Sequence, residues 1–102
     1  MDFKVEASHD KIVIRIIGEV TAETCGELRD AVIELIRKAP QSLVLDLSDM
    51  PFIDTSGLGV LVGLRAQAKK GNVTLTVQNP QARILQVFRI TQLAKVFGIP
   101  TE

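Results

Sequence analysis

The sequence predicts an α/β fold in which helices pack against a mixed β-sheet, and three observations support this. Two β-rich segments, residues 3–7 and 11–17, are separated by a short turn, which predicts an antiparallel hairpin. Segments with helical spacing of apolar residues then alternate with short apolar runs, as in parallel strands joined through helices. The 102 residues, 46% of them apolar, suffice for one hydrophobic core. We therefore expect a single domain over residues 1–102, with about three to four helices.

Charge and cysteine content exclude several classes of function. The chain carries 12 lysine and arginine residues and 12 aspartate and glutamate residues, so no net charge draws it to nucleic acid or an anionic membrane. Its single cysteine, Cys25, allows no internal disulfide and has no companion that would complete a metal site. The amino-terminal residues lack a secretory signal, and no apolar run reaches the roughly 20 residues that span a bilayer. We expect a cytoplasmic protein without cofactor, metal, direct nucleic-acid contact or membrane insertion.

The amino-terminal hairpin is predicted from two segments of strand character. Phe3–Ala7 alternates apolar and polar residues, and Lys11–Ile17 is rich in β-branched residues. His9 and Asp10 between them form the expected turn. His9, the only histidine, is therefore expected to be a solvated turn residue and not a general base.

A first helix is predicted after Gly18-Glu19-Val20. Thr24 and Glu27 have the spacing of a capping box, and Pro40 marks the end of the helix. Its apolar residues recur at helical intervals: Leu28, Ala31, Val32, Leu35 and Ile36.

A central strand and a second helix follow. Ser42–Leu47 is a short apolar run suited to a strand buried on both faces of a sheet. The second helix is predicted from apolar residues that start at Leu58, and its polar tail stops at Gly71-Asn72. Phe52 and Ile53 are expected to pack beneath its start.

The last third of the chain predicts one strand and one helix before the tail. Val73–Val77 alternates as a strand. Asn79 and Pro80 supply an N-cap and a first-turn proline for a third helix. A short strand or extended tail at Ala94–Phe97 is expected to close the chain before the terminal proline.

The segment Asp54-Thr55-Ser56-Gly57 lies where a buried strand gives way to a helix, so free backbone N–H groups and the positive end of the helix dipole meet there. A phosphoryl group on either hydroxyl would add roughly −1.5 to −2 charges beside those groups. Gly57 and Gly59 keep the backbone approachable and let the helix pack closely. Asp54 would repel a phosphate placed next to it, which suggests a device for releasing a partner.

A purely structural interpretation of this segment stays open at this point. Aspartate, threonine and serine are the commonest N-caps, and glycines at a helix start often only ease packing.

The segment Leu45–Val60 resembles the signature of STAS domains, specifically the bacterial anti-sigma factor antagonists. The resemblance covers nearly the whole chain. It includes the turn Gly18-Glu19-Val20, the glycine-led strand Gly71–Val77 and the closing segment Phe88–Phe97. It implies the STAS fold, in which a mixed sheet with an amino-terminal hairpin and parallel strands is packed with helices.

The resemblance also implies a function in bacterial signalling. Such antagonists bind an anti-sigma factor, which releases the sigma factor for transcription. The anti-sigma factor is also a kinase of the histidine-kinase-like ATPase fold, which phosphorylates the hydroxyl residue after the motif aspartate, and a PP2C-type phosphatase reverses this partner switching. Thr55 is the implied acceptor, and the neighbouring Ser56 remains the alternative. The implied partner-binding residues are Glu19, Thr21, Asp54, Gly57, Leu58 and Gly59.

One position departs from the family pattern. Thr21 stands where the family commonly has aspartate, so it can cap a helix but offers no negative charge to a partner. Glu19 supplies a carboxylate nearby.

Two other functions remain as alternatives. The chain could be a STAS accessory or scaffold subunit of a lipid-transport ABC complex or of a stress-sensing assembly. An enzyme that uses Asp46, Asp49 and Asp54 to bind magnesium or transfer phosphoryl groups is less favoured, because no phosphate-binding lysine or nucleotide loop accompanies them. We therefore expect a non-enzymatic switch protein with no catalytic residues.

Overall fold

The computed structural model describes residues 1–99, so the last three residues of the expected domain, and the proline expected to end the tail, lie outside the described part. The elements are, in chain order, β1 (Asp2–Ser8), β2 (Lys11–Ile17), α1 (Cys25–Arg37), β3 (Ser42–Asp49), α2 (Thr55–Lys70), β4 (Thr74–Gln78) and α3 (Ala82–Ile90). The α/β class and the amino-terminal hairpin expected from the sequence are confirmed.

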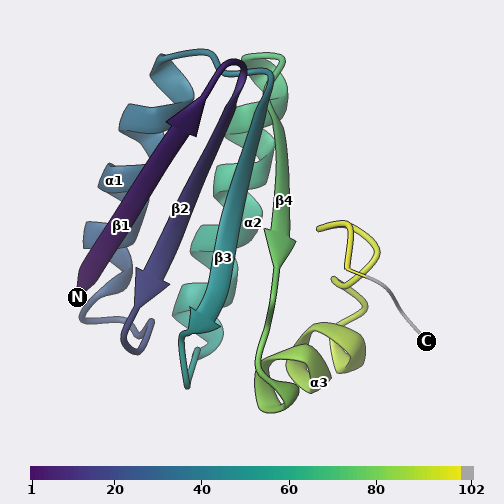
Figure 1. Cartoon of the computed structure of the whole chain (residues 1–102). Coiled ribbons are helices and arrows are strands. Elements are labelled where there is room, and N and C mark those ends of the chain that lie inside the picture. The colour runs from purple at the N-terminus through teal and green to yellow at the C-terminus, as the bar shows by residue number, and fades with distance from the viewer. Residues whose placement is uncertain (100–102) are drawn as a thin grey trace.

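The four strands form one mixed sheet in the order β1-β2-β3-β4. β1 runs antiparallel to β2, whereas β2, β3 and β4 are mutually parallel. Helices α1 and α2 cover one face of the sheet, and α3 lies beyond the carboxyl end of β4 (Figure 1). Because the parallel strands all end on the same side, the loops that follow β2 and β3 lie next to each other.

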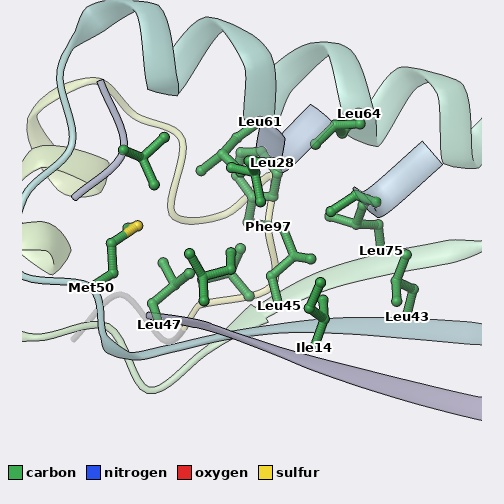
Figure 2. Packing of buried hydrophobic residues seen from close by; sticks show 14 of the residues in the cluster. Ile14, Leu28, Leu43, Leu45, Leu47, Met50, Leu61, Leu64, Leu75 and Phe97 are labelled. Carbon is green, nitrogen blue, oxygen red and sulfur yellow. The ribbon is translucent and has the colours of Figure 1, made fainter. Parts of the chain in front are cut away.

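The hydrophobic core fills the space between the helices and the sheet. Every second residue of β2 and β3 faces it: Ile12, Ile14, Ile16, Leu43, Leu45 and Leu47. Figure 2 shows strand residues such as Leu45 pointing toward Leu61 and Leu64 of α2. Burial of a leucine side chain stabilises the fold by roughly 1.5–3 kcal/mol, so this alternation fixes which face each strand presents to the helices.

The other face of the sheet, which we call the open face, carries the side chains of Lys4, Arg15 and Asp46 and has no described helix in front of it (Figure 1). The prediction that β3 is buried on both faces is therefore wrong for most of the strand. Val44 is buried on the open face, but Asp46 and Ser48 are only partly buried. Flanking strands, and not a second helical layer, shield Val44.

The capping box predicted at the start of α1 does not form. Thr24 occupies the N-cap position, but its side chain makes no cap hydrogen bond. Its Oγ1 instead accepts from the Thr21 N–H at 2.9 Å and donates to the Glu19 carbonyl at 2.8 Å. The hydroxyl thus fixes the loop before the helix.

The predicted start of α3 is also wrong. The helix begins at Ala82 with Gln81 as N-cap, and Asn79 adopts a left-handed conformation with φ of 58°. The Gln81 Nε2 donates to the Ser48 carbonyl at 2.9 Å, and the Asn79 amide lies 3.4 Å from Asp46 Oδ1. These contacts with β3 hold residues 79–81 in a loop, so the helix starts later than the proline suggested.

The expected terminal strand at Ala94–Phe97 is absent, since residues 91–99 form a series of turns. Phe97 is fully buried and contacts Phe88 edge to face, with 5.6 Å between ring centroids. Its carbonyl accepts from the Val77 N–H at 3.0 Å, which is the only such bond to the backbone of β4 among the described residues of this segment. One anchoring bond with buried aromatic packing replaces a fifth strand.

Candidate functional site

The candidate site is built where the loop after β2 meets the loop after β3. The Val20 N–H donates to the Phe52 carbonyl at 2.9 Å, and the Val20 carbonyl accepts from the Asp54 N–H at 3.1 Å. Val20 and Ile53 thereby form a short parallel bridge, and both side chains are buried. This bridge fixes the start of α2 against the loop that leads into α1.

Asp54 holds this junction through its carboxylate. One oxygen, Oδ1, accepts from the Gly57 N–H at 2.9 Å, and the other, Oδ2, accepts from the Ala22 N–H at 3.0 Å. Asp54 is thus the N-cap of α2 and a cross-link between two loops 32 residues apart. A negative charge at a helix start is also stabilised by the helix dipole.

The two hydroxyl residues of the motif, Thr55 and Ser56, occupy the first two positions of α2, and both are exposed. Asp54 supplies the cap, as the structural interpretation allows for this residue, and neither hydroxyl is needed for it. The N–H groups of Thr55 and Ser56 have no backbone acceptor among residues 1–99. Two accessible hydroxyls therefore stand beside free amide donors.

The two glycines of the motif have different surroundings. A Cβ at Gly57 would lie 2.7 Å from side-chain atoms of Val20 and Ile53, so Gly57 is an internal packing residue. A Cβ at Gly59 would meet nothing within 4 Å, and Gly59 is exposed. The close packing expected from these glycines belongs to Gly57, and the open backbone surface belongs to Gly59.

The remaining partner-binding residues implied by the sequence surround this junction. Glu19 is exposed, and Thr21 is half-buried, with its Oγ1 accepting from the Glu23 N–H at 3.2 Å. Leu58 is half-buried against the hydrophobic core, so it presents only part of its side chain outward. The structure thus brings Glu19 and Thr21 to the same end of the sheet as the motif.

Sequence reasoning missed two parts of this surface. Phe52 was expected beneath the motif together with Ile53, but Ile53 is buried and Phe52 is 40% exposed. A groove of about 360 Å³ also runs between α1 and α2, and it is lined by Arg29, Ile33, Ser56, Gly59, Val60, Gly63, Leu64 and Gln67. Only the recurrence of glycine at positions 59 and 63 within a helical pattern signalled this groove.

Two of the aspartates considered for an enzymatic site, Asp46 and Asp49, make structural contacts with the same arginine. Asp46 accepts from the Ser48 N–H at 3.0 Å, and Arg15 lies 3.7 Å from Asp46 and 3.6 Å from Asp49. Burial acts to raise the pKa of Asp46, but hydrogen bonds from Ser48 and Asn79 and the charge of Arg15 hold it below its ordinary value. Within residues 1–99 no cluster of three or more candidate ligands could hold a metal ion.

Cys25, at the first position of α1, is partly buried, and its Sγ lies 3.7 Å from the Ala22 carbonyl. Within residues 1–99, none of the helices has the length and apolar character needed to cross a bilayer.

The mixed sheet, the helices on one of its faces, and the helix that begins with two hydroxyl residues after an aspartate N-cap together define the class of protein. The model of the STAS domain family matches residues 2–102, and the chain belongs to this family. It is similar to the anti-sigma-B factor antagonist of Bacillus subtilis (strain 168), with 30% identity over 98 residues that cover 96% of this chain and 89% of the relative.

Solved structures show the same fold. An anti-sigma factor antagonist from Mycobacterium paratuberculosis superimposes with a TM-score of 0.79 at 24% identity, covering 99% of this chain and 86% of the other. The anti-sigma factor antagonist SpoIIAA matches in its unphosphorylated form with a TM-score of 0.76 at 21% identity, over 97% of this chain and 99% of the other. Its phosphorylated form matches with a TM-score of 0.71 at 21% identity, over 92% and 86%.

Proposed function

We propose that this chain is a cytoplasmic, non-enzymatic anti-sigma factor antagonist that binds an anti-sigma factor and is switched off by phosphorylation of its DTSG motif. The observation that carries the proposal is that Asp54 alone caps α2, which leaves the hydroxyls of Thr55 and Ser56 exposed and structurally unused. The similar chains named above, which are anti-sigma factor antagonists, support the same proposal.

The proposed partner is an anti-sigma factor that is itself a serine/threonine kinase of the histidine-kinase-like ATPase fold, with a PP2C-type phosphatase resetting the switch. The proposed docking surface for this partner lies on the present chain and combines Glu19, Thr21 and Gly59 with the exposed ring of Phe52. Apolar and polar groups together in one patch are typical of a transient protein interface. Docking there would bring the partner's active site to the start of α2.

Phosphorylation acts on this surface through charge. Thr55 is the proposed acceptor, with Ser56 as the alternative. A phosphoryl group adds roughly −1.5 to −2 charges beside the carboxylate of Asp54. The fold tolerates this charge because the free N–H groups at the start of α2 face it. The docked partner does not tolerate it, because the phosphoryl group adds to the negative charge of a surface that already carries Glu19 and Glu23.

The test uses the purified chain incubated with ATP and a lysate of its native host, followed by intact-mass and fragment mass spectrometry. Modification adds roughly 80 Da, the mass expected of one phosphoryl group, and we expect it on Thr55. It should disappear in Thr55→Ala and persist in Ser56→Ala, or the reverse if Ser56 is the acceptor. No modification while a known kinase substrate in the same lysate is phosphorylated would contradict the proposal.

A second measurement addresses the partner. Wild-type chain should capture a kinase from the lysate, and Thr55→Asp or Ser56→Asp should abolish capture without loss of fold. Thr74→Asp is the matched control, because it adds the same charge to an exposed threonine on β4. Capture of an ATPase and a membrane permease without a kinase would instead select the accessory-subunit function.

A further inference from the structure

The outer edge of β1 has no partner strand among the described residues. β1 is the first strand of the sheet and pairs only with β2 (Figure 1). At its centre, Val5 is 50% exposed. An unpaired edge presents a row of backbone donors and acceptors that a further strand can use.

The hairpin determines which backbone groups lie at this edge. His9 and Asp10 form a two-residue turn, and Ser8 pairs with Lys11. The pair that flanks a two-residue turn is hydrogen-bonded, and such pairs alternate along an antiparallel ladder. The backbone groups of Phe3, Val5 and Ala7 therefore face the free edge.

The charges beside Val5 are opposite in sign and equally spaced. Lys4 and Glu6 both lie on the open face, one residue on either side of Val5. Lys4 is directly opposite Arg15, which is a repulsive pairing of like charges. Arg15 already contacts Asp46 and Asp49, whereas neither Lys4 nor Glu6 forms an ion pair within residues 1–99.

We propose that a second copy of this chain pairs antiparallel with β1 about a two-fold axis through Val5. In this register Lys4 of each copy lies opposite Glu6 of the other, and the two Val5 side chains meet. Across the joined sheet, four facing side chains then lie in one row: Asp46, Arg15, Lys4 and Glu6 of the second copy. The repulsion between Arg15 and Lys4 is therefore offset by a carboxylate on each side.

This register also agrees with the backbone. A two-fold axis through Val5 makes the two Val5 residues a hydrogen-bonded pair, and Phe3 then pairs with Ala7 of the other copy. Each of these residues has its N–H and C=O at the free edge. A shift by one residue would direct the wrong backbone groups across the interface, and a shift by two would place like charges opposite each other.

The two-fold axis is perpendicular to the sheet, which has a consequence for the rest of the molecule. The second copy runs in the opposite direction, so the starts of the two α2 helices lie at opposite ends of the joined sheet. Each copy in the dimer keeps its own candidate site, and the association does not depend on the proposed function.

The experiment is sedimentation equilibrium of the full chain over a wide concentration range. We expect a reversible dimer with affinity in the micromolar to millimolar range, as suits a small interface. Lys4→Glu and Glu6→Lys should each weaken it by about tenfold or more, because each converts two attractive pairs into repulsive ones. An equimolar mixture of the two variants should form a heterodimer, because one carries only negative and the other only positive charges at these positions.

Controls separate this register from other modes of association. The double variant K4E/E6K should dimerise like the wild type, and Lys11→Glu, at the other end of the hairpin, should leave the affinity unchanged. Circular dichroism reports whether each variant is folded. A wild-type chain that is monomeric at every concentration would overturn the proposal. So would a dimer whose affinity is the same in both single charge reversals and in their mixture as in the wild type.

Discussion

The carboxylate of Asp54 binds two backbone N–H groups that belong to different parts of the chain. Gly57 lies in the first turn of α2, and Ala22 precedes α1. A single side chain therefore sets both the start of a helix and its distance from the neighbouring loop. The hydroxyls of Thr55 and Ser56 are therefore carried by a backbone whose position is already fixed.

Replacing this carboxylate is expected to destabilise the fold. Asp54→Ala removes the cap and the link to Ala22, and the free energy of unfolding should fall by about 1–2 kcal/mol. Chemical denaturation measures this change. Asp30→Ala, on the exposed side of α1, is the control and should change stability by no more than about 0.5 kcal/mol. Equal effects of the two substitutions would show that the cap is unimportant.

The glycines of the motif should respond in opposite directions to alanine. Gly57→Ala places a methyl group against Val20 and Ile53 and should cost about 1–3 kcal/mol. Gly59→Ala fills open space on a helix and should stabilise the chain by roughly 0.5–1 kcal/mol. Thermal or denaturant unfolding of this matched pair gives both values. Destabilisation by Gly59→Ala would contradict the open surroundings of Gly59 in the structure.

At the scale of elements, residues 91–99 cover an edge that would otherwise be exposed. β4 is the last strand of the sheet, and the carbonyl of Phe97 accepts a hydrogen bond from Val77. The buried ring of Phe97 then contacts that of Phe88 in α3. The tail and α3 thus form one unit that protects β4 from pairing with other chains, while β1 at the opposite edge stays open.

Truncation of the buried ring tests this element. Phe97→Ala should lower the free energy of unfolding by about 3–5 kcal/mol, because it leaves a cavity beside Phe88. Val96→Ala, next to it and 38% exposed, should cost much less. Denaturant unfolding compares the two, and hydrogen exchange at Val77 should accelerate only in Phe97→Ala. A small effect at Phe97 would mean that the tail is not part of the cooperative fold.

At the scale of the whole molecule, Asp46 connects β2, β3 and the loop before α3 through contacts with Arg15, Ser48 and Asn79. In the folded state its pKa lies below the ordinary value. The unfolded chain, with a pKa of about 3.9 for such a group, therefore takes up a proton more readily than the folded chain does. The stabilisation is present above the unfolded pKa and is lost as the pH falls through the folded pKa.

Asp46→Asn should consequently flatten the acid side of the stability profile. The wild type should lose free energy of unfolding more steeply than the variant between about pH 5 and pH 2. Urea unfolding at a series of pH values measures the two slopes. Parallel profiles would show that Asp46 does not contribute to the acid sensitivity.

Periodicity in the sequence predicted most of the elements because burial dictates it. The alternation in Lys11–Ile17 and the helical spacing from Leu58 onward identify which side chains face the core, and each pattern depends only on local chain geometry. The motif at positions 54–57 was also recognisable, since a strand end followed by a helix start needs a cap there. The sequence by itself therefore determined the fold class and the place of the candidate site.

Tertiary structure decided what depends on contacts between distant residues. Thr24 and Asn79 both have good capping chemistry, yet partners at Glu19 and Asp46 engage their side chains in loops. The tail at residues 94–97 has strand-like composition, but the buried ring of Phe97 holds it in turns. Only the fold showed that Asp54 takes the cap and leaves the hydroxyls of Thr55 and Ser56 exposed, because several local choices are nearly equal in energy until a long-range contact selects one.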